Sequence, residues 1–399
     1  MRPSAMIAIG LVVGQGAVYL ATPLLSRIYS PEQIGTAAAV LAAGGVIGAV
    51  GTARLELLLS SAEDEEVRWL TRRASMLMIV MATALSPVAG LILGFSMLDT
   101  VFTALTAIGI SSVGLSLQIA SRLRELRGIA AAKAVQGVGQ TAVQIALGVP
   151  APSVGMQTGA AFGLLAAGGV QALSARRGLR ALPAAKLKPG RGRQIVRSAL
   201  MLTAAAAGNA TVVAALPMLT QGFFGAETTG QLAVAQRLAL APAGLAVAAV
   251  LPVVIAQFGA AARADLGASR AVVIRWLRRL LPLGLVATAA LLAAPLVPLS
   301  ALLGPEWDGV GLYVAAMAPQ IGAQLVAGPL SQCLVIQRRE RTQLVWDMVR
   351  LAAVFGVAAL VVLVGGDAVA MVSAVSIVLV LGYAVHVWLV IGTPRSHSV

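Results

Sequence analysis

Long apolar stretches follow one another along almost the whole chain, and short polar breaks separate them. Each stretch approaches the roughly 20 apolar residues with which a helix crosses a bilayer. Because backbone polar groups in lipid must be bonded internally, a spanning segment is a helix or part of a closed barrel. These runs are too long and continuous for barrel strands. The pattern therefore predicts an all-α polytopic membrane protein with about twelve transmembrane helices. The predicted spans are 5–26, 34–60, 74–97, 100–120, 128–150, 153–174, 197–221, 229–258, 280–303, 309–336, 344–364 and 368–391.

The composition agrees with a core that lies in lipid. Hydrophobic residues make up 59% of the 399 residues and charged residues 11%, less than half the share typical of soluble domains. The net charge of +14 would suggest a nucleic-acid partner in a soluble protein. Here the positive residues gather in short loops between apolar runs, which orients a membrane protein and excludes nucleic acid as the expected partner.

Every second loop between the predicted helices is basic. The alternate loops hold Arg27, no other Lys or Arg, and several acids. Because Lys and Arg collect on the cytoplasmic side of membrane proteins, the alternation predicts that both termini are cytoplasmic. The basic loops hold Arg68, Arg72 and Arg73; Arg122, Arg124 and Arg127; Arg176, Arg177, Arg180, Lys186, Lys188, Arg191 and Arg193; Arg263, Arg270, Arg275, Arg278 and Arg279; and Arg338, Arg339 and Arg341.

The basic loop before the ninth predicted helix carries an amphipathic segment, Arg270–Arg279. Val272 and Trp276 can share one helix face, with Arg275 and Arg278 opposing them. Such a pattern is typical of a helix that lies in the headgroup region, so an interfacial helix is predicted here.

The chain shows no pattern of a catalytic, metal or cofactor site. Cys333 is the one cysteine, and His386 and His397 are too few to form a metal site. No phosphate-binding Gly-Lys-Ser/Thr loop occurs, and every external loop is too short to hold the active site of a polysaccharide polymerase or ligase. The chain is therefore not expected to be an enzyme.

The two halves of the chain carry matching residues in the same order. These matches favour a duplicated six-helix unit in parallel orientation, a common architecture among transporters. The predicted halves are 1–175 and 197–399, and the basic segment 176–196, rich in Pro and Gly, is predicted to be an extended cytoplasmic linker. The matches are Gly14-Gln15 with Gly208-Asn209, Pro23–Ser26 with Pro217–Thr220, Glu32 and Gly35 with Glu227 and Gly230, and Arg124-Glu125 with Arg339-Glu340.

Several segments resemble Wzx-type oligosaccharide flippases of the multidrug, oligosaccharidyl-lipid and polysaccharide exporter superfamily. Together they cover most of the chain in the family's order. One departure is Leu55, where the family usually has an aromatic residue between the Arg and the Glu. The segments are Thr22–Gly35, Thr52–Leu58 with the acidic Glu63–Glu66, Phe224–Arg237 with Pro242, and Leu303–Tyr313 with Pro329–Ser331.

The resemblance implies two six-helix bundles that rock around a central cavity, as in MATE-like transporters. It implies a bacterial inner-membrane flippase that moves an undecaprenyl-diphosphate-linked oligosaccharide to the external leaflet for surface polysaccharide biosynthesis. The implied partners are membrane lipids, a coupling ion, a polysaccharide polymerase and a chain-length regulator. The alternative is a drug or cation exporter of the same fold, which would need cavity carboxylates rather than an excess of cations.

Charges within membrane helices are costly and are functional candidates by default. Arg54 and Glu56 lie two apart, so they are not expected to share a helix face. Lys133 is a candidate that could instead snorkel to the interface, and Arg54 could instead pair with another helix. Asp347 and Arg350, three apart, could instead pair with each other on one face. The predicted substrate-binding set is Arg237, Arg54, Arg350, Lys133, Gln15, Asn209 and Gln236, and the coupling candidates are Glu56 and Asp347.

Overall fold

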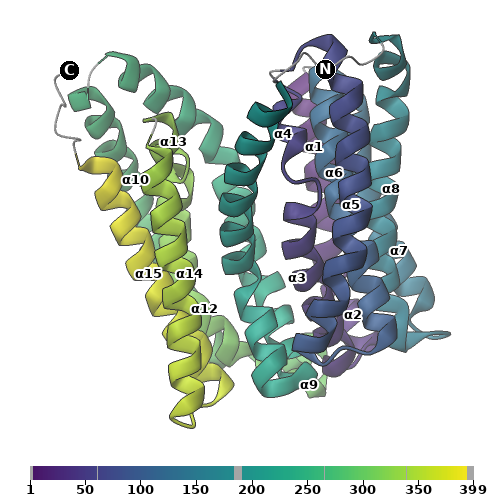
Figure 1. The fold of residues 1–399 in the computed structure, drawn as a ribbon. Helices are drawn as coiled ribbons and strands as arrows, with labels where there is room; N and C mark the ends of the chain where they lie inside the picture. Colours follow the sequence, from purple (N-terminus) through teal and green to yellow (C-terminus); the bar gives the residue numbers. More distant parts are fainter. Residues whose placement is uncertain (1–2, 61, 184–190, 265, 338, 393–399) are drawn as a thin grey trace. The chain divides into compact units, whose positions relative to one another are not determined.

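The computed structural model describes residues 3–60, 62–183, 191–264, 266–337 and 339–392 (Figure 1). All regular structure within these ranges is helical. The helices are α1 (Pro3–Leu20), α2 (Thr22–Ile28), α3 (Pro31–Gly51), α4 (Leu55–Leu58), α5 (Asp64–Leu93), α6 (Met97–Arg122), α7 (Leu126–Leu147), α8 (Pro152–Ala181), α9 (Arg191–Ala264), α10 (Leu266–Leu292), η1 (Ala294–Leu296), α11 (Leu299–Leu303), η2 (Pro305–Trp307), α12 (Val310–Ala327), η3 (Gly328–Leu330), α13 (Cys333–Ile336), α14 (Glu340–Leu363) and α15 (Ala368–Ile391).

Eleven helical segments in the described ranges are long and apolar enough to cross a membrane. They correspond to all the predicted spans but the fifth, so the predicted fold class is confirmed. The fifth span is α7, which is a full-length helix but carries Lys133 and the amides Gln136, Gln140 and Gln144. These polar residues lower the mean hydropathy of α7, although the helix packs along α1 and α8 inside the bundle.

The seventh and eighth predicted spans form one long segment, α9, with a single break. The break is at Gly225, whose φ of 84° lies in the left-handed region that glycine adopts without steric cost. It falls inside the predicted gap of 222–228, so the two predicted helices are confirmed.

The predicted extended linker is largely helical at its two ends. Helix α8 continues to Ala181, and α9 begins at Arg191. The sequence interpretation was wrong for these flanks, because arginines at helix ends were taken as loop residues. Residues 184–190 lie outside the described residues.

The chain folds into two compact units, Met1–Gly230 (unit 1) and Gln231–Val399 (unit 2). In unit 1 the helix pairs α1–α7, α7–α8, α6–α8 and α3–α6 pack along one another. The crossing of α1 and α7 is a backbone contact, because a Cβ atom on Gly14 or on Gly137 would collide with main-chain atoms of the other helix. Small residues thus allow the close helix approach that is common in membrane bundles.

The core of unit 2 corrects the predicted interfacial helix. Helix α10 begins at Leu266 and runs through the arginine-rich segment without a break. Val272 and Val273 are 8% and 0% exposed and pack with Val254 and Phe258 of α9. The apolar face therefore meets protein rather than lipid headgroups, and the span predicted at 280–303 starts too late.

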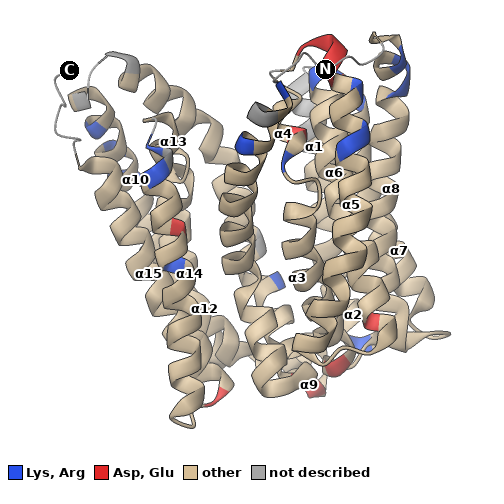
Figure 2. Ribbon diagram, viewed as in Figure 1, with Lys and Arg blue, Asp and Glu red and all other residues tan. Residues whose placement is uncertain are grey.

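Charges are sorted along the helices of each unit. Figure 2 shows most Lys and Arg near the end of each unit where α5, α10 and α14 begin. Glu32 and Asp99 lie in the first turns of α3 and α6, at the opposite end of unit 1. That the basic end faces the cytoplasm remains the prediction of the charge pattern.

Candidate functional site

The clearest polar site in unit 1 lies at the break between α3 and α4. Ala53 and Arg54 have φ angles of 48° and 55°, in the left-handed region that side chains other than glycine rarely adopt. Each such residue costs about 1–3 kcal/mol and persists where the surrounding structure holds it. Two of them in succession turn the chain sharply inside the bundle.

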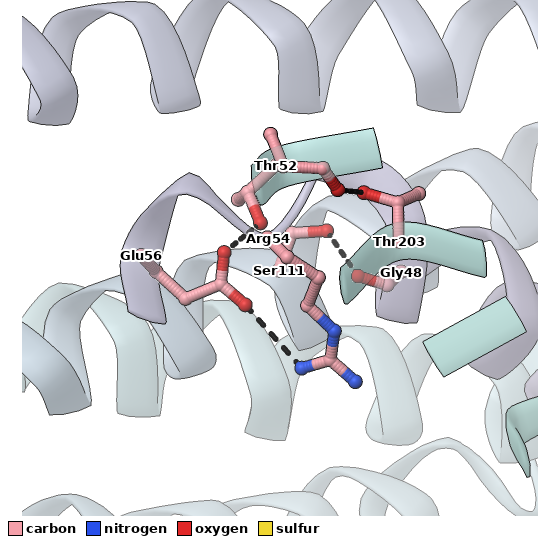
Figure 3. A network of polar contacts seen from close by, with 7 residues as sticks. Gly48, Thr52, Arg54, Glu56, Ser111 and Thr203 are labelled. Carbon is pink, nitrogen blue, oxygen red and sulfur yellow. Dashed lines mark hydrogen bonds and ion pairs between the residues drawn. The ribbon is translucent and has the colours of Figure 1, made fainter. Parts of the chain in front are cut away.

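Figure 3 shows the polar network that this turn creates. The Glu56 carboxylate is buried; one oxygen accepts from the Thr52 hydroxyl, and the other lies 3.3 Å from Nη1 of Arg54. Ser111 of α6 donates to the Gly48 carbonyl at 2.9 Å and so fixes the end of α3. The expectation that Arg54 and Glu56 would not meet was wrong, because it assumed a continuous helix.

Arg54 keeps hydrogen-bonding capacity at this site. Its side chain is 30% exposed, and the described residues occupy Nη1 alone. The planar guanidinium can therefore bind a second anion through Nε and Nη2, as suits a phosphate oxygen pair. The exposed fraction means that such an anion could reach it.

Lys133 and Gln15 come from helices that touch. Gly14 packs against the backbone of Lys133, which puts both residues at one level of the α1–α7 crossing. Among the described residues Lys133 makes no ion pair or hydrogen bond, and it is half-buried. A half-buried ammonium without a protein partner can bind an anion or extend toward the interface, so both sequence interpretations stay open.

Three predicted residues lie on α9. Asn209 is exposed on the unit 1 part, whereas Gln236 and Arg237 are half-buried on the unit 2 part. Arg237 follows the break at Gly225 by twelve residues, or about 18 Å along a helix. Arg237 therefore lies about three helical turns beyond the break.

Unit 2 contains a second ion pair within its helices. Asp347 and Arg350 are joined at 3.2 Å on α14, and Gln343 donates to the other Asp347 oxygen at 3.0 Å. The pairing that the spacing allowed is therefore present.

Two ion pairs at the start of α5 were not expected from the sequence. Arg122 Nη2 lies 2.6 Å from Asp64, and Arg191 Nε lies 3.1 Å from Glu66, which is 3% exposed. The sequence analysis placed Arg122 and Arg191 in basic loops and assigned them no partner. The acidic run that opens α5 was the available signal, since carboxylates are favoured in the first turn of a helix.

The fold can be compared with solved structures. An inward-closed lipid II flippase MurJ superposes with a TM-score of 0.69 at 13% identity, over 98% of this chain and 88% of that chain. An inward-facing multidrug resistance MATE transporter of the MOP superfamily superposes with a TM-score of 0.63 at 14% identity, over 98% and 97%. The chain has the MATE-like transporter fold. A point mutant of the Vibrio cholerae MATE transporter VcmN gives 0.62 at 14%, over 98% and 94%.

Sequence comparisons add no narrower assignment. No protein-family model matches the chain, and no curated protein matches it. The identities to the solved structures are 13% and 14%, which is low enough that the likeness shows the fold alone. Among the described residues, no group of three or more His, Cys, Asp or Glu side chains is arranged to hold a metal ion.

Proposed function

We propose that the chain is a flippase that moves an undecaprenyl-diphosphate-linked oligosaccharide from the cytoplasmic to the external leaflet of the bacterial inner membrane. The observation that carries the proposal is the cationic character of the polar positions inside the helices. Lys133 has no anionic partner among the described residues, and Arg54 keeps free donors beside its own ion pair. A diphosphate headgroup supplies the negative charge that such positions lack.

The remaining roles follow from the chemistry of the substrate. Arg54, Lys133, Arg237 and Arg350 neutralise the diphosphate at successive stages of its passage. Gln15, Asn209 and Gln236 offer amides to sugar hydroxyls. Glu56 and Asp347 are the coupling candidates, because each is a buried carboxylate held by an arginine.

In this mechanism residues 1–175 and 197–399 are the two repeats that rock against each other, with both termini in the cytoplasm. The fold is shared with a lipid II flippase, which supports a lipid-linked substrate. A polysaccharide polymerase and a chain-length regulator would receive the exported product.

The second candidate is a drug or cation exporter, which the fold shared with MATE transporters favours. A cation substrate needs unpaired carboxylates. The buried carboxylates Glu56, Glu66 and Asp347 each lie beside an arginine. This pairing makes the exporter the weaker of the two proposals.

The test is the lipid-linked sugar that accumulates in a strain lacking the gene, identified by mass spectrometry. We expect an undecaprenyl-diphosphate oligosaccharide to build up and to disappear when the wild-type gene is restored. Arg54→Ala should fail to clear it, whereas Arg72→Ala should clear it, because Arg72 is an exposed arginine at the start of α5. No accumulation, together with new drug sensitivity, would refute the flippase and favour the exporter.

A further inference from the structure

A second buried polar group lies on α15, which packs against the helix of the Asp347–Arg350 pair and is the most apolar span of the described chain. His386 is 6% exposed on α15, which exceeds the other candidate membrane spans in mean hydropathy. An ionisable ring at such a position is costly and calls for a functional reason. The proposed flippase mechanism uses Asp347 and Arg350 but leaves His386 without a role.

Helix geometry puts His386 at the depth of the ion pair. Helices α14 and α15 are antiparallel neighbours joined by a short turn. Asp347 lies seven residues after the start of α14, or about 10 Å, and His386 lies five residues before the end of α15, or about 8 Å. One turn before His386, a Cβ atom on Gly382 would lie 3.4 Å from the Trp346 ring and 3.7 Å from Arg350 Cδ.

The contact with the Leu330 carbonyl favours one tautomer of the neutral ring. Its Nε2 lies 3.4 Å from the Leu330 carbonyl of η3, and a carbonyl oxygen accepts hydrogen bonds only. Nε2 therefore carries the hydrogen of the neutral ring, and the lone pair of Nδ1 is left to bind a proton. The charged groups that act on the ring are Asp347 and Arg350, and the neutral titratable groups of the same region are Cys333 on α13 and Tyr383 on α15.

We propose that His386, together with Asp347 and Arg350, forms a proton-binding site in unit 2. With a neutral ring the three side chains sum to zero charge, and with a proton on Nδ1 they sum to one positive charge. One net charge in an apolar helix pair is costly unless water reaches it. The ring therefore takes up a proton when the cluster is hydrated and releases it when the helices close, which links protonation to the transport cycle.

The binding test reads the ring directly. The chain has two histidines, so His397→Gln leaves His386 as the one imidazole signal in the ¹⁵N NMR spectrum of the full chain in lipid nanodiscs. Between about pH 9 and about pH 5 we expect conversion from the Nε2–H neutral ring to imidazolium. At a fixed pH the ratio of protonated to neutral ring should fall about tenfold in Asp347→Asn and rise about tenfold in Arg350→Gln. A ring that stays neutral throughout, or equal ratios in the two variants, overturns the site.

The coupling test uses His386→Gln, which keeps an amide donor for the Leu330 carbonyl but cannot bind a proton. In proteoliposomes, movement of an undecaprenyl-diphosphate oligosaccharide should lose its dependence on an imposed pH gradient in this variant and keep its downhill rate. Gradient-dependent transport that survives the substitution refutes the coupling. The NMR titration needs no substrate, so failure of the proposed function and failure of the proton site are distinguishable.

Discussion

Helices α3 and α9 cross closely near the end of unit 1 where Glu32 and Glu227 lie. The crossing joins Gly35 and Gly230, which match each other in the two sequence repeats. A Cβ atom on Gly35 of α3 would collide with the Ala226 carbonyl and lie 2.6 Å from the Gly230 nitrogen. A Cβ atom on Gly230 would in turn collide with the backbone of Pro31. Since each glycine meets the backbone around the other, the crossing joins matching positions of the two predicted repeats. Transport by rocking repeats requires the crossing to open.

The perturbation is Gly35→Ala. Overpacking against backbone atoms, which cannot rotate away, costs about 1–3 kcal/mol in the state where the helices touch. The better helix propensity of alanine returns about 1 kcal/mol in every state. Only the steric cost differs between the closed and the open crossing. It therefore shifts the equilibrium toward the open crossing, by a factor of ten for about each 1.4 kcal/mol. Gly45→Ala on the same helix is the matched control, because its nearest neighbour would be 4.0 Å away.

The assay is thiol labelling of a cysteine introduced on α3 one turn after the crossing. Ala39 is 0% exposed and shares a face with Gly35, one turn further along α3. In a Cys333→Ser background, Ala39→Cys should react with a membrane-impermeant maleimide about tenfold faster when Gly35→Ala is present. Gly45→Ala should leave the rate unchanged. Equal labelling rates in the two alanine variants would refute the reasoning.

Three further outcomes are expected from single sites. Arg237→Ala should abolish glycan export at normal protein abundance and Arg237→Lys should restore part of it, because an ammonium lacks the bidentate fork; full export by Arg237→Ala would contradict the role. Ala53→Gly should raise the thermal unfolding temperature, because it relieves left-handed strain of about 1–2 kcal/mol, whereas Ala49→Gly within α3 should lower it; a decrease in both would argue against strain at the turn. Arg191→Ala should destabilise unit 1 by about 1–3 kcal/mol, because it leaves the Glu66 carboxylate buried, and adding Glu66→Gln should recover most of the loss; an additive double variant would exclude that coupling.

The positions of the spanning helices along the chain could be predicted because lipid imposes one requirement on every span. A segment of sufficient apolar length can satisfy its backbone as a helix without help from the rest of the chain. Helix α7 was also predicted as a span, and the alternation of basic loops is consistent with it. The predicted helix boundaries were wrong where a helix face packs against protein instead of lipid. The start of α10 is buried by α9, and nothing in the arginines of Arg270–Arg279 reveals that partner.

The Thr22–Gly35 region shows how tertiary contacts add to a correct sequence interpretation. The Ser30-Pro31 start of α3 has a capping box in which Ser30 and Gln33 bond each other's backbone, a local pattern. The buried Tyr29 hydroxyl donates to the Gln144 carbonyl of α7 at 2.5 Å, a contact between residues 115 positions apart. Burial raises the pKa of Tyr29, so its hydroxyl remains a donor at physiological pH. No periodicity in the sequence could have paired these two positions.

The candidate site shows the same division between local and long-range information. Asp347 and Arg350 pair as their spacing allows, because α14 is a regular helix there. Arg54 and Glu56 meet against the helical rule, because two left-handed residues reverse the chain between α3 and α4. That reversal depends on Thr52 and on the Ser111–Gly48 bond from α6, which only the folded unit supplies. A strained turn that holds an arginine beside a buried carboxylate, with donors left over, is therefore a property of the fold. It makes Arg54 a stronger candidate for anion binding than its position in the sequence could.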